Sequence, residues 1–328
     1  MALPRTRWPV RLLHAGAMAL VFACAQAAAA SLAYVPNQKS GSISVIDTAS
    51  DQVVRTLTAQ GTLGKRLQAI EVAADGRTLY VVDAARSLLV AIDPARDAVL
   101  HTADIGPGAE GVRLAPDGRT LAVCAEAQHQ ALLLSAATLA IEARIPVQGR
   151  NPEHCEFTPD GKWLLTSNEG SDNLDVIDVG KRASVATIAT SGHPRGAAFV
   201  DATHAWVAQE GANAVDVVDV AARTRVASVP TALRAAGVIA SPDRKRVYVA
   251  NGGAGSVSVV DVASRKVVKE IAVGKRPWNM ALTPDGGKLY VANGRSNSVS
   301  VIDTAKLAII GEIAVGELPW GVVIAPAP

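Results

Sequence analysis

Seven short segments, spaced about 42 residues apart, carry side chains of the kinds that bind ligands. Each segment precedes an apolar run, as in "GRNPEHCEF" and "GKRPWNMAL". Four of the segments share a proline at one aligned position, and the position after it differs chemically from copy to copy. This set consists of Gln68, Glu110, Glu153, Arg195, Ala236, Trp278 and Trp320. Carboxylates, a guanidinium and indoles are typical of concave sites for small ligands or peptides.

Two neighbouring positions add further polar groups. The next position is mostly Ala or Gly but holds His154 and Asn279 in two copies. Two positions before the first set stand Arg66, Asn151, His193, Arg234 and Arg276. Consecutive strand residues point to opposite faces, which argues against a Glu153–His154 catalytic dyad. We therefore predict a binding site without catalytic residues, the alternative being a hydrated channel with polar walls.

A sequence repeat must position these residues. One landmark is an apolar residue followed by aspartate, at Asp47, Asp93, Asp178, Asp219, Asp261 and Asp303, with Ser135 filling the gap. The spacings are 46, 42, 43, 41, 42 and 42 residues. A second landmark, "PDG" or a weakened form of it, keeps the same register. Such a period is typical of repeat architectures, here with seven units.

Each unit contains four short β-branched runs separated by Asp, Gly, Asn and Ser, such as "KLYVAN" and "SVSVID". Four strands and their turns fill a unit and leave no room for a helix. We therefore predict an all-β, seven-bladed β-propeller over residues 31–328, with four antiparallel strands per blade. The propeller region begins at "LAYVPN", which corresponds to the second strand of a unit, so a first strand is missing. The last residues, "PWGVVIAPAP", supply one. The C-terminal strand is thus expected to complete the N-terminal blade.

The residues of the repeat also carry a family resemblance. The segments "LYVANGRSNSVSVIDTA" and "VYVANGGAGSVSVVDVA" resemble the YVTN family of seven-bladed propellers. The opening "AYVPNQKSGSISVIDTASDQVVRTL" is most similar to propeller proteins associated with PQQ-dependent catabolism. This resemblance implies a periplasmic accessory protein of PQQ-dependent alcohol oxidation. The motif "VN" is "AN" here, and the third blade lacks both "YV" and "ID", which leaves its turns in doubt.

Residues that recur in every unit are interpreted as structural. The aspartate of "VID" and that of "PDG" occupy turn positions, where a carboxylate accepts backbone N–H bonds. Asn37, Asn168, Asn251 and Asn293 end the second strand of their units and receive the same interpretation. Chemistry specific to this protein is instead expected where equivalent positions differ.

The first 30 residues are predicted to be a secretory signal peptide. Arg5, Arg7 and Arg11 precede the apolar run "LLHAGAMALVFACA" and the small residues before Ser31. The run is short for a membrane anchor, and a lipoprotein site at Cys24 is the remaining alternative. We expect a periplasmic protein with no membrane span. Removing three of 32 basic residues and no acids leaves 29 against 30, a charge of −1 that does not favour nucleic acid.

The remaining cysteines, Cys124 and Cys155, lie on strands of successive units. The sequence leaves open whether they pair in an oxidising compartment or stay as buried thiols. The motifs CxxCH, CxxC, HExxH and GxSxG do not occur, and a GxGxxG phosphate loop before a helix is also lacking. We accordingly predict no metal site and no resident cofactor.

Three functions remain as hypotheses. The first is a monomeric, non-catalytic scaffold that holds a small molecule or a periplasmic partner, such as a PQQ-dependent dehydrogenase or its transport system. The second is a lactonase-like hydrolase at the channel mouth, an activity known for other seven-bladed propellers. The third is direct PQQ binding, with the two indoles stacking on a planar quinone.

Overall fold

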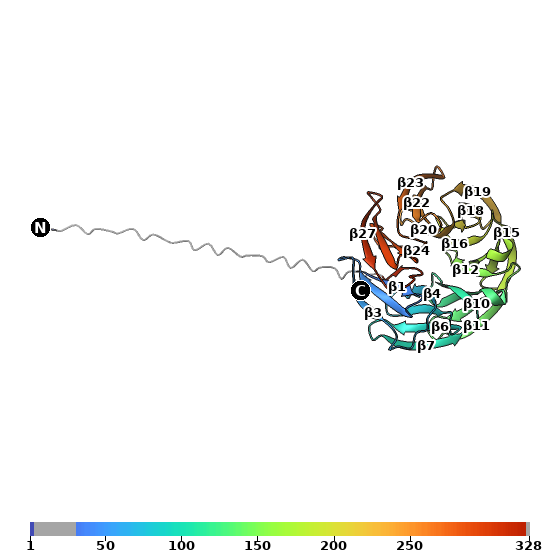
Figure 1. The fold of residues 1–328 in the computed structure, drawn as a ribbon, viewed down its shortest axis with the longest axis horizontal. Coiled ribbons are helices and arrows are strands. Elements are labelled where there is room, and N and C mark those ends of the chain that lie inside the picture. The colour runs from blue at the N-terminus through green and yellow to red at the C-terminus, as the bar shows by residue number, and fades with distance from the viewer. Residues whose placement is uncertain (3–30, 326–328) are drawn as a thin grey trace.

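The computed structural model describes residues 1–2 and 31–325, and the predicted signal peptide therefore falls outside the described residues. Residues 31–325 form 28 β-strands in seven four-stranded antiparallel sheets. The sheets stand as blades around one axis (Figure 1). The predicted seven-bladed, all-β propeller is confirmed.

The same four strand positions recur in every blade. The innermost strands, which surround the axis, are β4 (Leu67–Val72), β8 (Ala109–Leu114), β12 (Pro152–Phe157), β16 (Pro194–Phe199), β20 (Ala235–Ala240), β24 (Pro277–Leu282) and β28 (Val323–Ile324). The second strands are β1 (Leu32–Asn37), β5 (Leu79–Asp83), β9 (Thr120–Ala125), β13 (Trp163–Asn168), β17 (His204–Gln209), β21 (Arg246–Asn251) and β25 (Lys288–Asn293).

The third strands are β2 (Ser42–Asp47), β6 (Leu88–Asp93), β10 (Gln130–Ser135), β14 (Asn173–Asp178), β18 (Ala214–Asp219), β22 (Ser256–Asp261) and β26 (Ser298–Asp303). The outermost strands are β3 (Gln52–Leu57), β7 (Ala98–Asp104), β11 (Ile141–Pro146), β15 (Ala183–Ala189), β19 (Thr224–Pro230), β23 (Lys266–Ala272) and β27 (Ala308–Ala314). Two short 3₁₀ helices, η1 (Glu126–Gln128) and η2 (Glu169–Ser171), follow β9 and β13.

The ring closes through the two ends of the described chain. Strand β28 pairs antiparallel with β1, with Ala33 opposite Ile324 and Tyr34 opposite Val323. The Trp320 amide donates to the carbonyl of Pro36 at 3.0 Å. The C-terminal strand completes the N-terminal blade as predicted, so the blade that begins the chain also has a paired inner strand.

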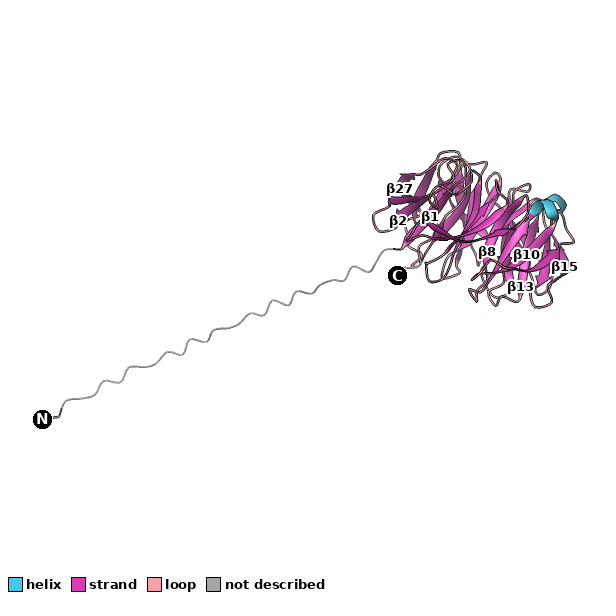
Figure 2. Ribbon diagram, turned by 90° about the horizontal axis from the view of Figure 1, so that it is seen from below, coloured by secondary structure: helices cyan, strands magenta, loops and turns pink. Residues whose placement is uncertain are grey.

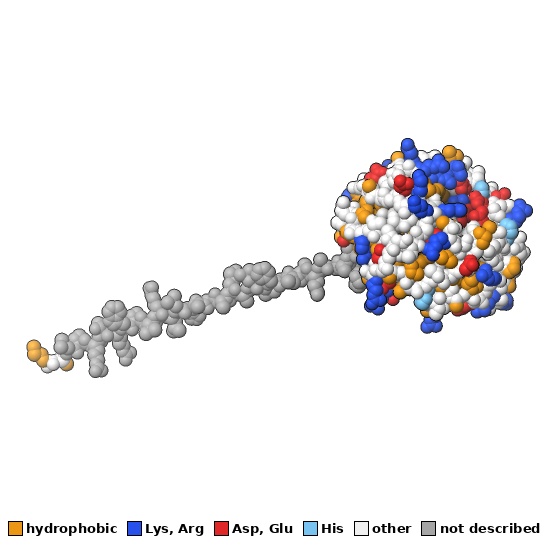
Figure 3. Space-filling view, turned by 60° about the horizontal axis from the view of Figure 1, so that its bottom comes forward, with side chains coloured by type: hydrophobic (Ala, Val, Ile, Leu, Met, Phe, Trp, Pro, Cys, Tyr) orange, Lys and Arg blue, Asp and Glu red, His pale blue; other side chains and the backbone are white. Residues whose placement is uncertain are grey.

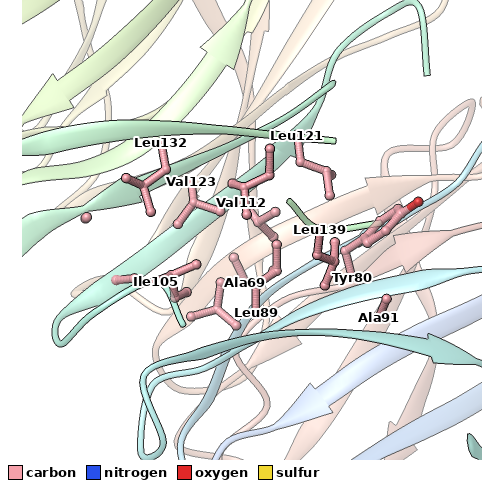
Figure 4. Packing of buried hydrophobic residues seen from close by; sticks show 14 of the residues in the cluster. Ala69, Tyr80, Leu89, Ala91, Ile105, Val112, Leu121, Val123, Leu132 and Leu139 are labelled. Carbon is pink, nitrogen blue, oxygen red and sulfur yellow. The ribbon is translucent and has the colours of Figure 1, made fainter. Parts of the chain in front are cut away.

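The core lies between neighbouring blades. Second and third strands are buried on both faces, whereas the outermost strands face solvent along most of their length, as in β3. Between the second and third blades, Tyr80 and Leu89 pack against Leu121 and Leu132 (Figure 4). Small and β-branched side chains fill these layers because the blades stack closely around the axis.

The recurrent polar residues are structural, as predicted. Asp47 Oδ1 accepts backbone N–H bonds from Ala49 and Ser50 at 2.8 and 3.0 Å. Asp117 of a "PDG" turn accepts one from Arg119 at 2.8 Å. The fully buried Asn251 donates to a serine of the adjacent strand. These contacts fix the turns and strand ends in each blade.

The third blade keeps its turns despite its degenerate sequence. Ser135 takes the place of the usual aspartate, and its carbonyl accepts from the Leu139 amide at 2.8 Å. Cys124 of β9 and Cys155 of β12 form a disulfide, with their Cα atoms 6.0 Å apart. The pairing question left open by the sequence is thus answered by a covalent link between the third and fourth blades.

The disc has two distinct faces. We call the face where the innermost strands begin the mouth face; both short helices lie there (Figure 2). The opposite face carries the "PDG" turns that follow the innermost strands, and we call it the turn face. The residues predicted to bind a ligand all stand at the mouth face.

Candidate functional site

Four of the predicted site residues form two hydrogen-bonded pairs at the mouth. They occupy the second position of four consecutive innermost strands. Gln68 Nε2 donates to Glu110 Oε1 at 2.5 Å, and Arg195 Nη1 donates to Glu153 Oε2 at 2.6 Å. Glu110 is also among the neighbours that raise the pKa of Glu153. Radial repetition therefore brings residues 42 positions apart into contact, as the sequence predicted.

Three glutamates that the sequence analysis did not single out join this group. Glu126, Glu169 and Glu210 directly follow the second strands of three consecutive blades. Arg195 Nη1 lies 3.4 Å from Glu169 Oε1 and 3.5 Å from Glu210 Oε2. The same repeat position is Gln, Ala or Gly in the other blades, so aligning it would have revealed the set. We call these three residues, with Glu110 and Glu153, the acidic arc.

Aromatic and imidazole rings close the channel at the mouth. The rings of His154 and Trp320 lie 5.8 Å apart between centroids. Together with Arg195, Trp278 and Asn279 they border a gap that does not admit a water-sized sphere. The predicted residues do converge on the axis, but they fill the channel instead of lining an open entrance. We call His154, Arg195, Trp278, Asn279 and Trp320 the plug.

The predicted rim residues lie around this plug. His193 Nε2 is 2.5 Å from Glu169 Oε1. The guanidinium of Arg276 stands 5.7 Å from the Trp278 ring centroid, a cation–π distance, and 3.4 Å from Glu210 Oε1. Arg66 is exposed at the start of β4.

The Arg234 guanidinium also binds Glu210, with its Nε donating at 2.6 Å. The mouth face therefore joins an acidic sector to a basic one, and Figure 3 shows red and blue side chains next to each other in the upper part of the disc. The acidic sector comes from the third to fifth blades, and the arginines precede the innermost strands of the sixth and seventh.

Burial controls the charge state of the plug. The pKa of Glu153 is raised well above its ordinary value, chiefly by burial, although the charge of Arg195 opposes the shift. The pKa of His154 is lowered well below its usual range by burial and by the charges of Arg195 and Arg113. His154 is thus neutral at physiological pH. The pKa of Glu126 is raised by burial and by neighbouring carboxylates.

The alternation of side chains along the strand does not keep Glu153 and His154 apart. The register of β12 with β13 shifts between Pro152 and His154, and this irregularity lets His154 Nε2 approach Glu153 Oε1 to 3.8 Å. The separation exceeds hydrogen-bond distance. The group can hold charge and donate or accept hydrogen bonds, but its residues offer no serine or cysteine nucleophile.

A second concavity occupies the channel below the plug. It has a cavity volume of about 490 Å³, and it extends from His154 and Trp320 to the prolines of the "PDG" turns, Pro116 and Pro159. On its wall Arg113 Nη1 lies 3.2 Å from Glu71 Oε2, and Arg113 Nη2 lies 2.6 Å from Glu156 Oε2. Burial raises the pKa of Glu156 to about 7, although Arg113 opposes the shift.

Sequence analysis did not identify this triad. Glu71, Arg113 and Glu156 each stand three residues after a member of the first site set, and thus at equivalent repeat positions. The other blades place Ala198, Ile239, Ala281 and Val323 there. Comparing this position across the repeats would have shown the divergence.

Fold and site together define a seven-bladed β-propeller with a charged mouth face and a central cavity. Residues 117–283 match the family described as YNCE-like beta-propeller, and the chain belongs to that family. No curated protein is similar to the chain in a sequence comparison.

Several solved structures share the fold. A functionally unknown protein from Desulfotomaculum acetoxidans DSM 771 is 18% identical with a TM-score of 0.78, covering 90% of this chain and 99% of its own. Kuenenia stuttgartiensis hydrazine synthase is 19% identical with a TM-score of 0.70, covering 79% and 92%. The dihydro-heme d1 dehydrogenase NirN in complex with DHE is 17% identical with a TM-score of 0.66, covering 86% and 63%. At these identities the likeness concerns the fold alone.

The described residues contain neither a membrane-spanning helix nor a cluster of metal-ligating side chains. No helix in residues 1–2 and 31–325 is long and apolar enough to cross a membrane. Within the same residues, no group of three or more His, Cys, Asp or Glu side chains is arranged to hold a metal ion.

Proposed function

We propose that this protein is a non-catalytic, periplasmic binding propeller whose mouth face docks a protein partner. One observation carries the proposal: the acidic arc and the adjoining arginines are gathered at a mouth where the gap between His154, Trp278 and Trp320 is too narrow for a water molecule. Because the plug leaves no room inside the mouth, a partner must contact the charged groups from above.

The distribution of charge supports a protein partner. The five acidic side chains of the arc come from three consecutive blades, and one of them, Glu210, pairs with Arg234 and Arg276, which neighbouring blades contribute. A surface divided into an acidic and a basic sector fixes the orientation of an oppositely patterned partner and accelerates its association. The rigid blades hold the loops that carry these groups in place.

The pathway is part of the proposal and rests on sequence resemblance. The opening segment "AYVPNQKSGSISVIDTASDQVVRTL" and the predicted signal peptide support a periplasmic accessory role in PQQ-dependent alcohol oxidation. The partner proposed first is accordingly a PQQ-dependent dehydrogenase of the same organism, and its transport system comes second.

The test is a direct binding measurement with the purified dehydrogenase at low and physiological salt. The double variant Glu126→Gln/Glu169→Gln removes two charges of the acidic arc without changing side-chain size. We expect binding to weaken about tenfold and its salt dependence to flatten, because rim charges act mainly on association. Glu142→Gln, on the outer strand β11, is the matched control.

Equal binding by the double variant and the control would contradict docking at the mouth face. The two other hypotheses are checked on the same protein, with tryptophan fluorescence reporting on Trp278 and Trp320. Saturable quenching by PQQ that disappears in Trp278→Ala would favour direct PQQ binding. Turnover of a lactone that is lost in Glu153→Gln would replace the scaffold by a hydrolase.

A further inference from the structure

The cavity below the plug is a closed-ended pocket that the mouth-face proposal does not use. His154 and Trp320 form its floor, and it opens beside Pro116 and Pro159 on the turn face. Its volume of about 490 Å³ lies within the range of small-molecule sites. A molecule can therefore enter from the turn face while the mouth face remains occupied.

The pocket wall is chemically divided. Charged side chains come from one side, where Arg113 of β8 and Glu156 of β12 line the pocket, and Glu71 of β4 pairs with Arg113. Around the rest of the wall, β16, β20 and β24 contribute Phe199, Ile239 and Met280. Such a wall suits a ligand with one charged end and an apolar body.

The triad holds two carboxylates on one guanidinium. Both oxygens of Glu71 are engaged, since Oε1 accepts the Val72 amide at 3.1 Å and Oε2 faces Arg113 at 3.2 Å. Glu156 uses Oε2 for Arg113, and its Oε1 accepts no hydrogen bond from the described residues. The Glu156 side chain is 19% exposed, toward the pocket. One carboxylate charge therefore lacks a cationic partner.

The other polar groups around the pocket do not compensate for this charge. His154 is neutral because of burial and the nearby arginines. Arg244 lines the opening but is exposed, and its Nη1 donates to the Phe199 carbonyl at 2.6 Å, so water screens its charge. Asn279 is uncharged, and the parts of β16, β20 and β24 that line the pocket supply no acid or base.

We propose that the channel binds an organic monocation, a primary amine with an apolar body, whose ammonium group pairs with Glu156 Oε1. An ammonium ion supplies the missing positive charge and donates to the free oxygen. Phe157, Phe199, Ile239 and Met280 then cover the apolar body. This inference is independent of the mouth-face function, because its site opens on the opposite face.

Amine binding at this site should depend on pH and release a proton. The pKa of Glu156 is raised to about 7. Below that pH most Glu156 side chains are protonated, and the amine must bind the minority that are ionised. The ionised fraction rises from about 0.09 at pH 6 to about 0.9 at pH 8, so the affinity should rise about tenfold. Binding near pH 6.5 should release a proton, because the ammonium ion stabilises the carboxylate.

The test is calorimetric titration with hexylamine at pH 6, 7 and 8. Hexanol and hexanoate have bodies of the same length, and they report apolar binding and anion binding respectively. We expect hexylamine to bind with the tenfold pH effect, and Glu156→Gln to weaken it at least tenfold at pH 8 and remove the effect. Glu142→Gln, on the outer strand β11, is the matched control.

Three outcomes would overturn the proposal: no saturable hexylamine binding, equal or tighter binding of hexanol or hexanoate, or undiminished binding by a folded Glu156→Gln variant. If that variant does not fold, two other measurements test the proposal. One is amine binding by Glu71→Gln, and the other is the proton release of the unaltered protein, measured in buffers of different ionisation enthalpy. The mouth variant Glu126→Gln/Glu169→Gln should keep its amine binding. That result separates failure of this site from failure of the docking function.

Discussion

Replacing Glu156 by glutamine removes the carboxylate whose charge is least compensated in the central channel. The change keeps the side-chain shape and leaves an amide oxygen that can still accept from Arg113 Nη2, now 2.6 Å from Glu156 Oε2. Because the channel wall is otherwise unaltered, the variant isolates the titration of one group. The measured quantity is the pH dependence of the free energy of unfolding.

The size of the effect follows from the pKa of Glu156, which burial raises from 4.5 to about 7. Between these values the folded protein keeps a proton that the unfolded chain has released. The stabilising contribution is thus fully present below pH 4.5 and is lost as pH rises through 7. Linkage predicts a loss of at most about 2.5 kcal/mol between pH 5 and pH 8, since some solvent reaches the group.

Urea denaturation followed by tryptophan fluorescence at pH 5, 6, 7 and 8 measures this quantity. The stability of the unaltered protein minus that of Glu156→Gln should fall by about 2 kcal/mol across the series. Titration of Glu153 and other groups cancels in the difference. Glu142→Gln should give a flat difference. A flat difference for Glu156→Gln as well would refute the claim that burial holds this carboxyl protonated.

Other expected outcomes concern stability around the mouth and channel. Replacing both Cys124 and Cys155 by alanine should lower the free energy of unfolding by about 3 kcal/mol, seen as a lower urea midpoint than that of the oxidised protein. An unchanged midpoint would mean that the disulfide adds nothing to a ring already closed by strand pairing. Arg195→Met should cost about 3–5 kcal/mol at pH 7, because it leaves the buried Glu153 without its cationic partner. The loss should shrink at pH 5 or when Glu153→Gln is added, and a pH-independent loss would indicate packing instead. Gly237→Ala should lower the melting temperature by several degrees, since its Cβ would lie 2.3 Å from a backbone carbonyl oxygen of the next blade; an unchanged value would show that the inner strands can move apart.

The repeat was enough to predict the fold. Each unit carries the same strand runs and the same turn residues, so one pattern specifies seven similar sheets. Ring closure was also predictable, because the strand missing before Leu32 is supplied by Val323 and Ile324. Degeneracy of the third blade did not alter its turns, since the Leu139 amide donates to the Ser135 carbonyl just as the Asp51 amide donates to the Asp47 carbonyl in the first blade.

Part of the site was predictable for the same reason. Equivalent positions on neighbouring innermost strands must approach one another, and Glu153 and Arg195 do so at 2.6 Å. The same comparison, applied three residues later, would have indicated the Glu71–Arg113–Glu156 triad. Comparing the position directly after the second strand across the repeats would have indicated three further residues, Glu126, Glu169 and Glu210. These residues lie outside the three repeat positions on which the sequence-based prediction of the site rested.

The sequence by itself determined the number of blades, the closure of the ring and the set of residues that face the axis, because all three follow from a period repeated along the chain. Only the tertiary structure decided that His154 and Trp320 fill the mouth, that the cavity opens on the turn face, and that Cys124 reaches Cys155. These outcomes depend on how far side chains of particular sizes extend across a ring of fixed radius. A linear pattern specifies which residues meet there, but the remaining space is set by packing in three dimensions.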